Sequence, residues 1–336
     1  MYIAGIDIGG TTCGVSLAYL KKNNGEVDIL DKIEFSTPDT PDITIENFVF
    51  SLKKLLNRTN IDSLKGIGIS CGGPLDVDRG LILSPPNLPG WDEIDIITPF
   101  KKEFEVPAAL QNDANAGALA EWYFGAGKGC SHLIFLTFGT GMGAGLILNG
   151  SLYSGISDMA GEVGHIRLEE KGPVGYGKAG SFEGFCSGGG IARLARAEAE
   201  KAIKKNKPPL FCSNPKELDS ITAKKIGKAA QKGDELARKI FEIAGEKLGY
   251  GLSILIDILN PEKIIIGSIY GRQKSLLEPV VKRKLKEEAL DLSLSVCEIV
   301  PAALGEDIGN YAGISVIIEL LKEKGIINGF SLQLKK

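Results

Sequence analysis

The stretch Tyr2–Thr12, YIAGIDIGGTT, decides the fold class of this 336-residue chain. Residues 2–8 are apolar and β-rich, which predicts a buried strand that runs directly into a glycine turn. Glycines let successive backbone amides converge on an anion, threonine hydroxyls add donors, and the carboxylate of Asp7 can hold a magnesium ion or its water shell. The same residues also suit a plain β-hairpin. The turn matches neither GxxxxGK[ST] nor GxGxxG, so a P-loop or a dinucleotide-binding turn is not indicated.

A second copy of this pattern lies in the other half of the chain. Residues 133–138 predict a strand, the loop Gly139-Thr140-Gly141-Met142-Gly143 follows, and residues 144–148 predict the returning strand. This internal repeat indicates two similarly built α/β domains, and a glycine loop on each wall of a cleft would suit a triphosphate. Further strands are predicted over 14–20, 27–35, 65–70, 108–111 and 263–266, and helices over 44–58, 114–123, 181–204, 221–231, 234–259 and 306–324.

The composition is that of a globular protein that acts on small molecules. The net charge is −3, so no basic excess indicates nucleic acid as a partner. The N-terminus enters a strand without the basic region of a signal peptide, and no apolar run reaches the ~18 residues of a membrane helix. The 6 cysteines are scattered and form no CxxC pair, which is typical of reduced thiols. We therefore expect a cytoplasmic protein with neither nucleic acid nor a membrane as partner.

The pair Asn112-Asp113 follows the predicted strand 108–111. A carboxylate at a strand end that faces a cleft can accept a proton from an attacking hydroxyl. Phosphoryl transfer needs little more than alignment, a metal and charge neutralisation. Asp113 could equally cap the helix that follows, and the two roles do not exclude each other.

A third group combines acidic residues with one of the two histidines, in Gly161-Glu162-Val163-Gly164-His165 and at Glu183. Carboxylates and planar polar groups can bind the paired hydroxyls of a sugar. His165 could also be a structural residue, or a metal ligand together with the two glutamates.

Together these motifs, in their order and spacing, resemble the ROK family (repressors, open reading frames and kinases) over residues 2–322. The matching motifs are Asp7-Ile8-Gly9-Gly10-Thr11, Gly73-Pro74-Leu75-Asp76, Asn112-Asp113-Ala114-Asn115, Gly139-Thr140-Gly141 and Gly161-Glu162-Val163-Gly164-His165. The resemblance implies an α/β fold of two ribonuclease-H-like (actin/hexokinase-type) domains with an inter-domain cleft. We expect an N-terminal domain over 1–115, joined by the C-terminal helix 306–324, and a C-terminal domain over 116–305.

The resemblance also implies an ATP-dependent sugar kinase, in which Asp113 is the base for the 6-hydroxyl of glucose or a related hexose. Mg²⁺ would be carried with ATP near Asp7. The implied phosphate- and nucleotide-binding residues are Asp7, Gly9, Gly10, Thr11, Thr12, Gly139, Thr140, Gly141 and Gly267. The implied sugar-binding residues are Gly73, Asn87, Asn112, Asp113, Glu162, His165 and Glu183.

Other functions remain open within the same resemblance. The sugar could be an N-acetylhexosamine or fructose, and the protein could be a non-catalytic sugar-binding or regulatory member. Repressors of the family carry an N-terminal DNA-binding domain, for which a first strand at Tyr2 leaves no room. Dimers are frequent in the family, so a homodimer is expected.

Two departures concern the nucleotide. Many family members have a lysine after GGT, where this chain has Thr12. Ile266-Gly267-Ser268 falls where the family's adenosine motif lies, and Ser268 replaces a second glycine.

A third departure concerns metal. Many relatives hold a structural zinc ion through CxCGxxGCxE, and the matching cysteine positions are here Val174, Tyr176 and Ser181. One histidine cannot hold zinc tetrahedrally without three further ligands, so we predict no zinc site. His165 would then donate directly to a sugar hydroxyl. Packing by Tyr176 and Phe182 is expected to hold the loop instead.

Overall fold

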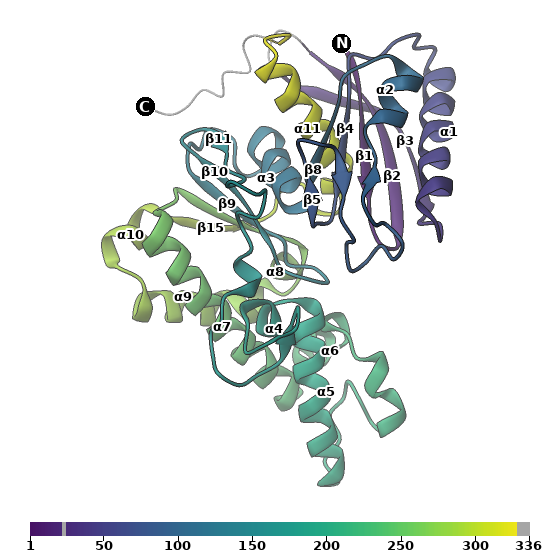
Figure 1. Cartoon of the computed structure of the whole chain (residues 1–336). Coiled ribbons are helices and arrows are strands. Elements are labelled where there is room, and N and C mark those ends of the chain that lie inside the picture. The colour runs from purple at the N-terminus through teal and green to yellow at the C-terminus, as the bar shows by residue number, and fades with distance from the viewer. Residues whose placement is uncertain (22–24, 328–336) are drawn as a thin grey trace. The chain divides into compact units, whose positions relative to one another are not determined.

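The structure, a computed structural model, describes residues 1–21 and 25–327 (Figure 1). The chain divides into two compact units. Unit 1 comprises Met1–Ser131, Gly145–Ala160 and Ala303–Lys336, and unit 2 comprises His132–Ala144 and Gly161–Ala302. Each unit is described by itself.

The main sheet of unit 1 has the strand order β3-β2-β1-β4-β8. Its strands are β1 (Tyr2–Ile8), β2 (Thr12–Leu20), β3 (Val27–Ser36), β4 (Ile67–Cys71) and β8 (Ala108–Asn112). β1, β2 and β3 form an antiparallel meander, whereas β4 and β8 run parallel to β1. The register aligns Ile8 with Cys71, and Cys71 with Asn112. The carboxyl ends of β1, β4 and β8 therefore meet at one edge, where open α/β sheets bind ligands.

Two helices cover this sheet closely. α11 (Ile308–Glu323) packs on β1, β4 and α3 (Asp113–Phe124), and α1 (Pro41–Thr59) packs on β2 and β3. α11 approaches so closely that a Cβ on Gly68 would lie 2.0 Å from the carbonyl oxygen of Gly313. The remaining elements of unit 1 include α2 (Thr98–Phe104), a small sheet of β5 (Leu75–Asp76), β6 (Leu81–Ile82) and β7 (Ile94–Asp95), and β11 (Ser151–Leu152).

A second five-stranded sheet has the order β11-β10-β9-β14-β15. Its other strands are β9 (Leu133–Leu136), β10 (Ala144–Leu148), β14 (Lys263–Ile266) and β15 (Glu298–Pro301), and β9, β14 and β15 are parallel. The helices of unit 2 are α4 (Phe182–Cys186), α5 (Gly188–Lys204), α6 (Ala223–Gln231), α7 (Glu235–Leu259), α8 (Ser268–Arg272), α9 (Lys274–Glu288) and α10 (Asp291–Val296). β12 (Val174–Gly175) and β13 (Lys178–Ala179) form a separate hairpin, and short 3₁₀ turns cover Val163–His165, Pro215–Ser220 and, in unit 1, Gly305–Asp307.

The structure corrects one predicted element. The single helix expected over 181–204 is two helices, because Ser187 is extended (φ −98°) and its hydroxyl caps α5 by accepting from the Gly190 amide at 2.9 Å. The first segment of unit 1 ends at Ser131, and α3 of this segment packs on α11. The domain boundaries expected at 115 and 305 stay predictions. Among the described residues, no helix is long and apolar enough to cross a membrane.

Candidate functional site

The first glycine turn presents backbone amides to its surroundings. The Gly9 amide donates to the Thr12 carbonyl at 3.2 Å, and Thr37 fixes the turn from outside through the carbonyls of Gly9 (2.6 Å) and Thr11 (3.0 Å). Within residues 1–21 and 25–327, the amides of Gly10 and Thr11 form no hydrogen bond. Thr11 and Thr12 are exposed. The carbonyls are thus used to hold the turn, and the amides are left for an anion.

Asn87 lies beside this turn. A Cβ on Gly10 would lie 2.6 Å from the Asn87 carbonyl oxygen, so only glycine permits the approach. The loop is held in place by Trp91, which is 1% exposed and accepts a hydrogen bond from the Ser84 amide at 2.8 Å. Asn87 itself is exposed. The structure therefore brings a residue predicted to bind sugar next to the predicted phosphate turn of the same unit.

The start of α3 separates the roles of Asn112 and Asp113. Asn112 is the N-cap, and its side-chain oxygen accepts from the Ala114 amide at 2.9 Å. Asp113 is the first helical residue, its carboxylate is exposed, and one oxygen accepts from the same amide at 2.8 Å. Beneath them, the side-chain oxygen of Gln111 accepts from the Asn112 amide at 2.8 Å and from the Asn115 amide group at 3.1 Å. The strand end and the first helical turn are thereby clamped together.

Asp7 lies at the same sheet edge and has an unusual acidity. Burial raises its pKa from 3.8 to about 7, the negative charge of Asp113 acts in the same direction, and a hydrogen bond with Ser70 opposes both. α11 approaches Asp7 closely, since a Cβ on Gly309 would lie 2.8 Å from a carboxylate oxygen. Two neighbouring carboxylates fit a cation that would relieve their repulsion. Mg²⁺ usually takes only one or two carboxylates and completes its shell with water and phosphate.

Gly73 also belongs to this edge. A Cβ there would lie 3.1 Å from the side-chain nitrogen of Asn112, so Gly73 borders one of the predicted sugar ligands. Unit 1 thus brings together its predicted site residues at the carboxyl ends of β1, β4 and β8.

In the second glycine loop, in unit 2, as in the first, the carbonyls accept hydrogen bonds and, among the described residues, two successive amides do not donate any. Its carbonyls are bound by the start of α5: the Gly188 amide donates to Gly139 at 2.7 Å, and the Gly189 amide donates to Thr140 at 3.4 Å. The Gly139 amide turns inward to the Gly141 carbonyl at 3.2 Å. In the described part of the chain, the amides of Thr140 and Gly141 have no partner. Each unit therefore holds one turn with two successive amides available to an anion.

Glu183 braces this second loop, a role that the sequence motifs do not reveal. Its carboxylate accepts from the Met142 amide at 3.1 Å, and a Cβ on Gly141 would lie 3.0 Å from the same oxygen. Glu162 lies close enough to Glu183 and His165 for their charges to affect it. Its pKa is raised by burial and by the charge of Glu183, and His165 acts in the opposite direction. The three predicted sugar residues of unit 2 therefore form one cluster.

The loop in which many relatives carry zinc cysteines is a hairpin here. Ser181 is buried and caps α4 by accepting from the Gly184 amide at 3.1 Å, while Val174 is 47% exposed. Phe182 is fully buried, as expected, but the packing role predicted for Tyr176 is wrong, because its side chain is 68% exposed. Hydrogen bonds hold the loop instead, including one from the Lys178 ammonium to the His165 carbonyl at 2.8 Å.

No group of three or more His, Cys, Asp or Glu in the described ranges is arranged to hold a metal ion. The predicted lack of zinc stays a prediction.

The predicted adenosine motif lies at the end of β14. The Gly267 amide donates to the Leu136 carbonyl at 2.9 Å. Ser268, the first residue of α8, accepts from the Arg272 guanidinium at 3.0 Å. The serine that replaces a glycine is therefore used to orient an arginine.

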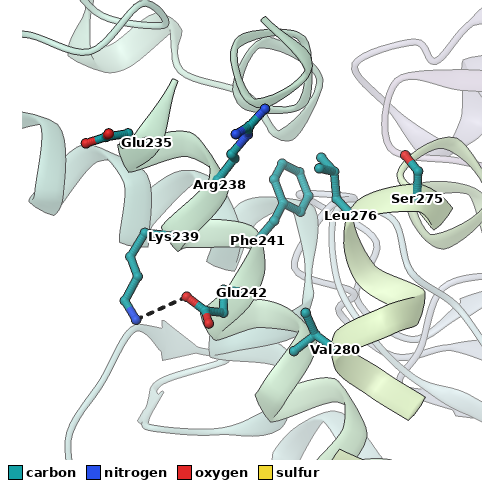
Figure 2. Close-up of a pocket in the computed structure, with 8 residues that line it drawn as sticks. All are labelled: Glu235, Arg238, Lys239, Phe241, Glu242, Ser275, Leu276 and Val280. Carbon is teal, nitrogen blue, oxygen red and sulfur yellow. Dashed lines mark hydrogen bonds and ion pairs between the residues drawn. The ribbon is translucent and has the colours of Figure 1, made fainter. Parts of the chain in front are cut away.

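An open pocket of about 430 Å³ lies between α7 and α9 of unit 2 (Figure 2). Its walls include the ion pair of Lys239 with Glu242 (3.2 Å) and the ring of Phe241. None of the predicted site residues lines this pocket, so it is separate from the clusters above.

Known proteins agree with this fold. Residues 3–319 match the ROK family. The glucokinase of Halalkalibacterium halodurans is 31% identical over 318 residues, which cover 93% of each chain. A Streptomyces griseus ROK glucokinase, solved with glucose and AMPPNP, is 25% identical with a TM-score of 0.75, covering 95% of this chain and 99% of that one. A ROK transcriptional regulator, a homologue of the Escherichia coli MLC protein, is 23% identical with a TM-score of 0.82, covering 95% and 78%.

The predicted fold class, α/β of the actin-like ATPase type, is confirmed by these structures. The glucokinase relatives and the sugar kinase structures support a sugar kinase that binds a small sugar and a nucleotide. The match over nearly the whole chain shows that this protein belongs to the ROK family.

Proposed function

We propose that the protein is an ATP-dependent hexose kinase that phosphorylates the 6-hydroxyl of glucose or a closely related hexose. The observation that carries this proposal is the exposed carboxylate of Asp113 at the end of β8. Asn112 caps the helix in its place, and Asp113 lies on the same sheet edge as Asp7 and the first amide turn. A general base, an anion-binding turn and a carboxylate suited to a cation are the parts that phosphoryl transfer needs.

In the proposed reaction, the Asp113 carboxylate accepts the proton of the sugar hydroxyl. The hydroxyl oxygen forms a bond to the γ-phosphorus of ATP, the bond to the β,γ-bridging oxygen breaks, and ADP leaves with that electron pair. Asn112, Asn87 and Gly73 of unit 1 and the cluster of unit 2 would orient the sugar. The free amides of both glycine turns would bind phosphate oxygens. Asp7 would hold Mg²⁺ or its water shell, and this ion would neutralise phosphate charge when bound.

The identity of the sugar is tested by a Mg-ATP turnover screen across hexoses and N-acetylhexosamines. We expect the highest kcat/KM for glucose or a near relative. If an N-acetylhexosamine or fructose is the best substrate, the proposed specificity is wrong and the proposed reaction, phosphoryl transfer to a sugar, still holds. A protein that binds a hexose without any turnover would be a non-catalytic sugar-binding member, a role compatible with the fold it shares with a regulator.

The role of Asp113 is tested by Asp113→Asn, which keeps the shape and removes the base. Loss of a general base typically costs 10²–10⁴-fold, so we expect kcat to fall by about that range while the sugar Kd changes little. Asp78→Asn is the matched control, because Asp78 is also an exposed carboxylate of unit 1. Undiminished turnover in Asp113→Asn would exclude Asp113 as the base. A homodimer and a cytoplasmic location stay predictions.

A further inference from the structure

Tyr176 occupies a backbone conformation that a large side chain rarely adopts. Its φ is 43°, that of Gly177 is 75°, and the two residues form the turn between β12 and β13, in which Gly175 pairs with Lys178. Two-residue hairpin turns with positive φ at both central residues favour Asn-Gly. A bulky residue in this region costs on the order of 1 kcal/mol.

Core packing does not offset this cost. The Tyr176 side chain is 68% exposed, whereas Phe182 of the same loop is fully buried. Neither the turn nor the core therefore explains a tyrosine at this position. An observed backbone outlier with an exposed aromatic ring is a reason to look for a function nearby.

The ring lies beside the cluster of Glu162, His165 and Glu183. The ring centroids of Tyr176 and His165 are 6.3 Å apart, with an interplanar angle of 76°. The hairpin is pressed against Glu183, because a Cβ on Gly175 would lie 2.9 Å from the Glu183 Cβ. The hydrogen bond from Lys178 to the His165 carbonyl ties the hairpin to the same segment. All of these contacts lie within unit 2.

We propose that Tyr176 contacts the sugar and contributes to its affinity and selectivity. This inference rests on the proposed function. A hexose presents hydroxyls around its edge and C–H groups on its faces. The cluster supplies partners for hydroxyls, and the exposed ring beside it supplies the apolar surface that the C–H groups need. Because this contact exists before and during phosphoryl transfer, its loss raises KM and leaves kcat unchanged.

The test compares Tyr176→Asn with Tyr176→Phe in the full chain. Asparagine tolerates positive φ, so Tyr176→Asn removes the ring and relieves the turn, and its melting temperature should equal or exceed that of the wild type. We expect the sugar Kd, measured calorimetrically without ATP, and the sugar KM to rise about tenfold. The kcat and the KM for ATP should stay within about twofold. Tyr176→Phe, which keeps the ring, should bind sugar within about twofold of the wild type.

Tyr153→Asn serves as the control, because Tyr153 is a 51% exposed tyrosine of unit 1. An unchanged sugar Kd and KM in Tyr176→Asn would overturn the inference, as would an equal effect of Tyr153→Asn. If Tyr176→Phe binds the sugar as weakly as Tyr176→Asn while remaining folded, the aromatic ring contributes nothing and the inference is wrong. Failure of the proposed function has a separate signature: the wild type would bind a hexose and not turn over ATP, and the Kd comparison would still decide the role of Tyr176. A wild type that binds no hexose overturns both.

Discussion

Glu121 is a fully buried carboxylate on α3, and it accepts three backbone amides. One oxygen accepts from Ala126 at 2.8 Å and from Ala303 at 3.2 Å, and the other accepts from Leu304 at 2.9 Å. The side chain thus joins the loop after α3 to the segment that re-enters unit 1 at Ala303. We predict that Glu121→Gln destabilises unit 1 by roughly 1.5–3 kcal/mol.

The magnitude follows from the number of acceptors. A glutamine keeps one oxygen, which can serve the Ala126 and Ala303 amides, but its NH₂ group then faces the Leu304 amide. At least one hydrogen bond to a charged group, worth roughly 1.5–3 kcal/mol, is lost. Glu121→Ala removes the acceptor of all three amides, so three hydrogen bonds to a charged group are lost, at roughly 1.5–3 kcal/mol each. That loss is comparable with the whole stability of an ordinary domain, about 5–15 kcal/mol, so the alanine variant should fail to fold.

The assay uses the position of the tryptophans. The chain's 2 tryptophans, Trp91 and Trp122, are both buried in unit 1, so their fluorescence during urea unfolding follows this unit. We expect a lower urea midpoint for Glu121→Gln with an unchanged slope. Glu46→Gln is the matched control, because Glu46 is exposed on α1. A midpoint for Glu121→Gln equal to that of the control would refute the bracing role.

Three further predictions concern the site. Because burial raises the pKa of Asp7 from 3.8 to about 7, the folded protein keeps a proton that the unfolded chain releases over this pH window. The free energy of unfolding therefore falls as the pH rises from about 4 to 7. Urea titrations in the presence of EDTA should show a smaller fall for Asp7→Asn, and a pH dependence identical to that of the wild type would contradict the prediction. Glu183→Gln should weaken the binding of AMPPNP several-fold in the absence of sugar, because the Glu183 carboxylate accepts from the Met142 amide of the second glycine loop. Glu162→Gln should leave AMPPNP binding unchanged, and equal effects of the two variants would exclude a role of Glu183 in holding this loop. Metal analysis should find no zinc, because no cysteine accompanies His165, and stoichiometric zinc would overturn that prediction.

The sequence predicts the buried strands best. Residues 263–266 and 144–148 were expected as strands and match β14 and β10, because continuous apolar runs bounded by glycine or polar turns have few other solutions. α9 (Lys274–Glu288) was not predicted. It contains Pro279, and its stability comes from close packing on α7, where a Cβ on Gly249 would lie 2.7 Å from the Lys284 Cβ. Such a helix depends on a partner distant in sequence, which local patterns do not contain.

The same distinction applies to the candidate site. The glycine turns and the acidic residues are local motifs, and the structure gathers those of each unit into one cluster. The bracing hydrogen bonds of Glu183 and Glu121 join segments 41 and 182–183 residues apart, so no spacing rule could reveal them. The exposure of Tyr176 was missed for a related reason, because an aromatic residue in a loop is usually expected to be buried.

Asn112 is the N-cap of α3 and Asp113 is its first residue, and this arrangement has a consequence for how the function of the fold can change. Asn112 accepts from the Ala114 amide, so an exchange of the neighbouring Asp113 carboxylate leaves the helix with its cap. If Asp113 is the base, as proposed, a single substitution at 113 would remove the base and leave the other proposed sugar-binding residues in place. On that proposal, one substitution would convert a sugar kinase into a sugar-binding protein without catalysis.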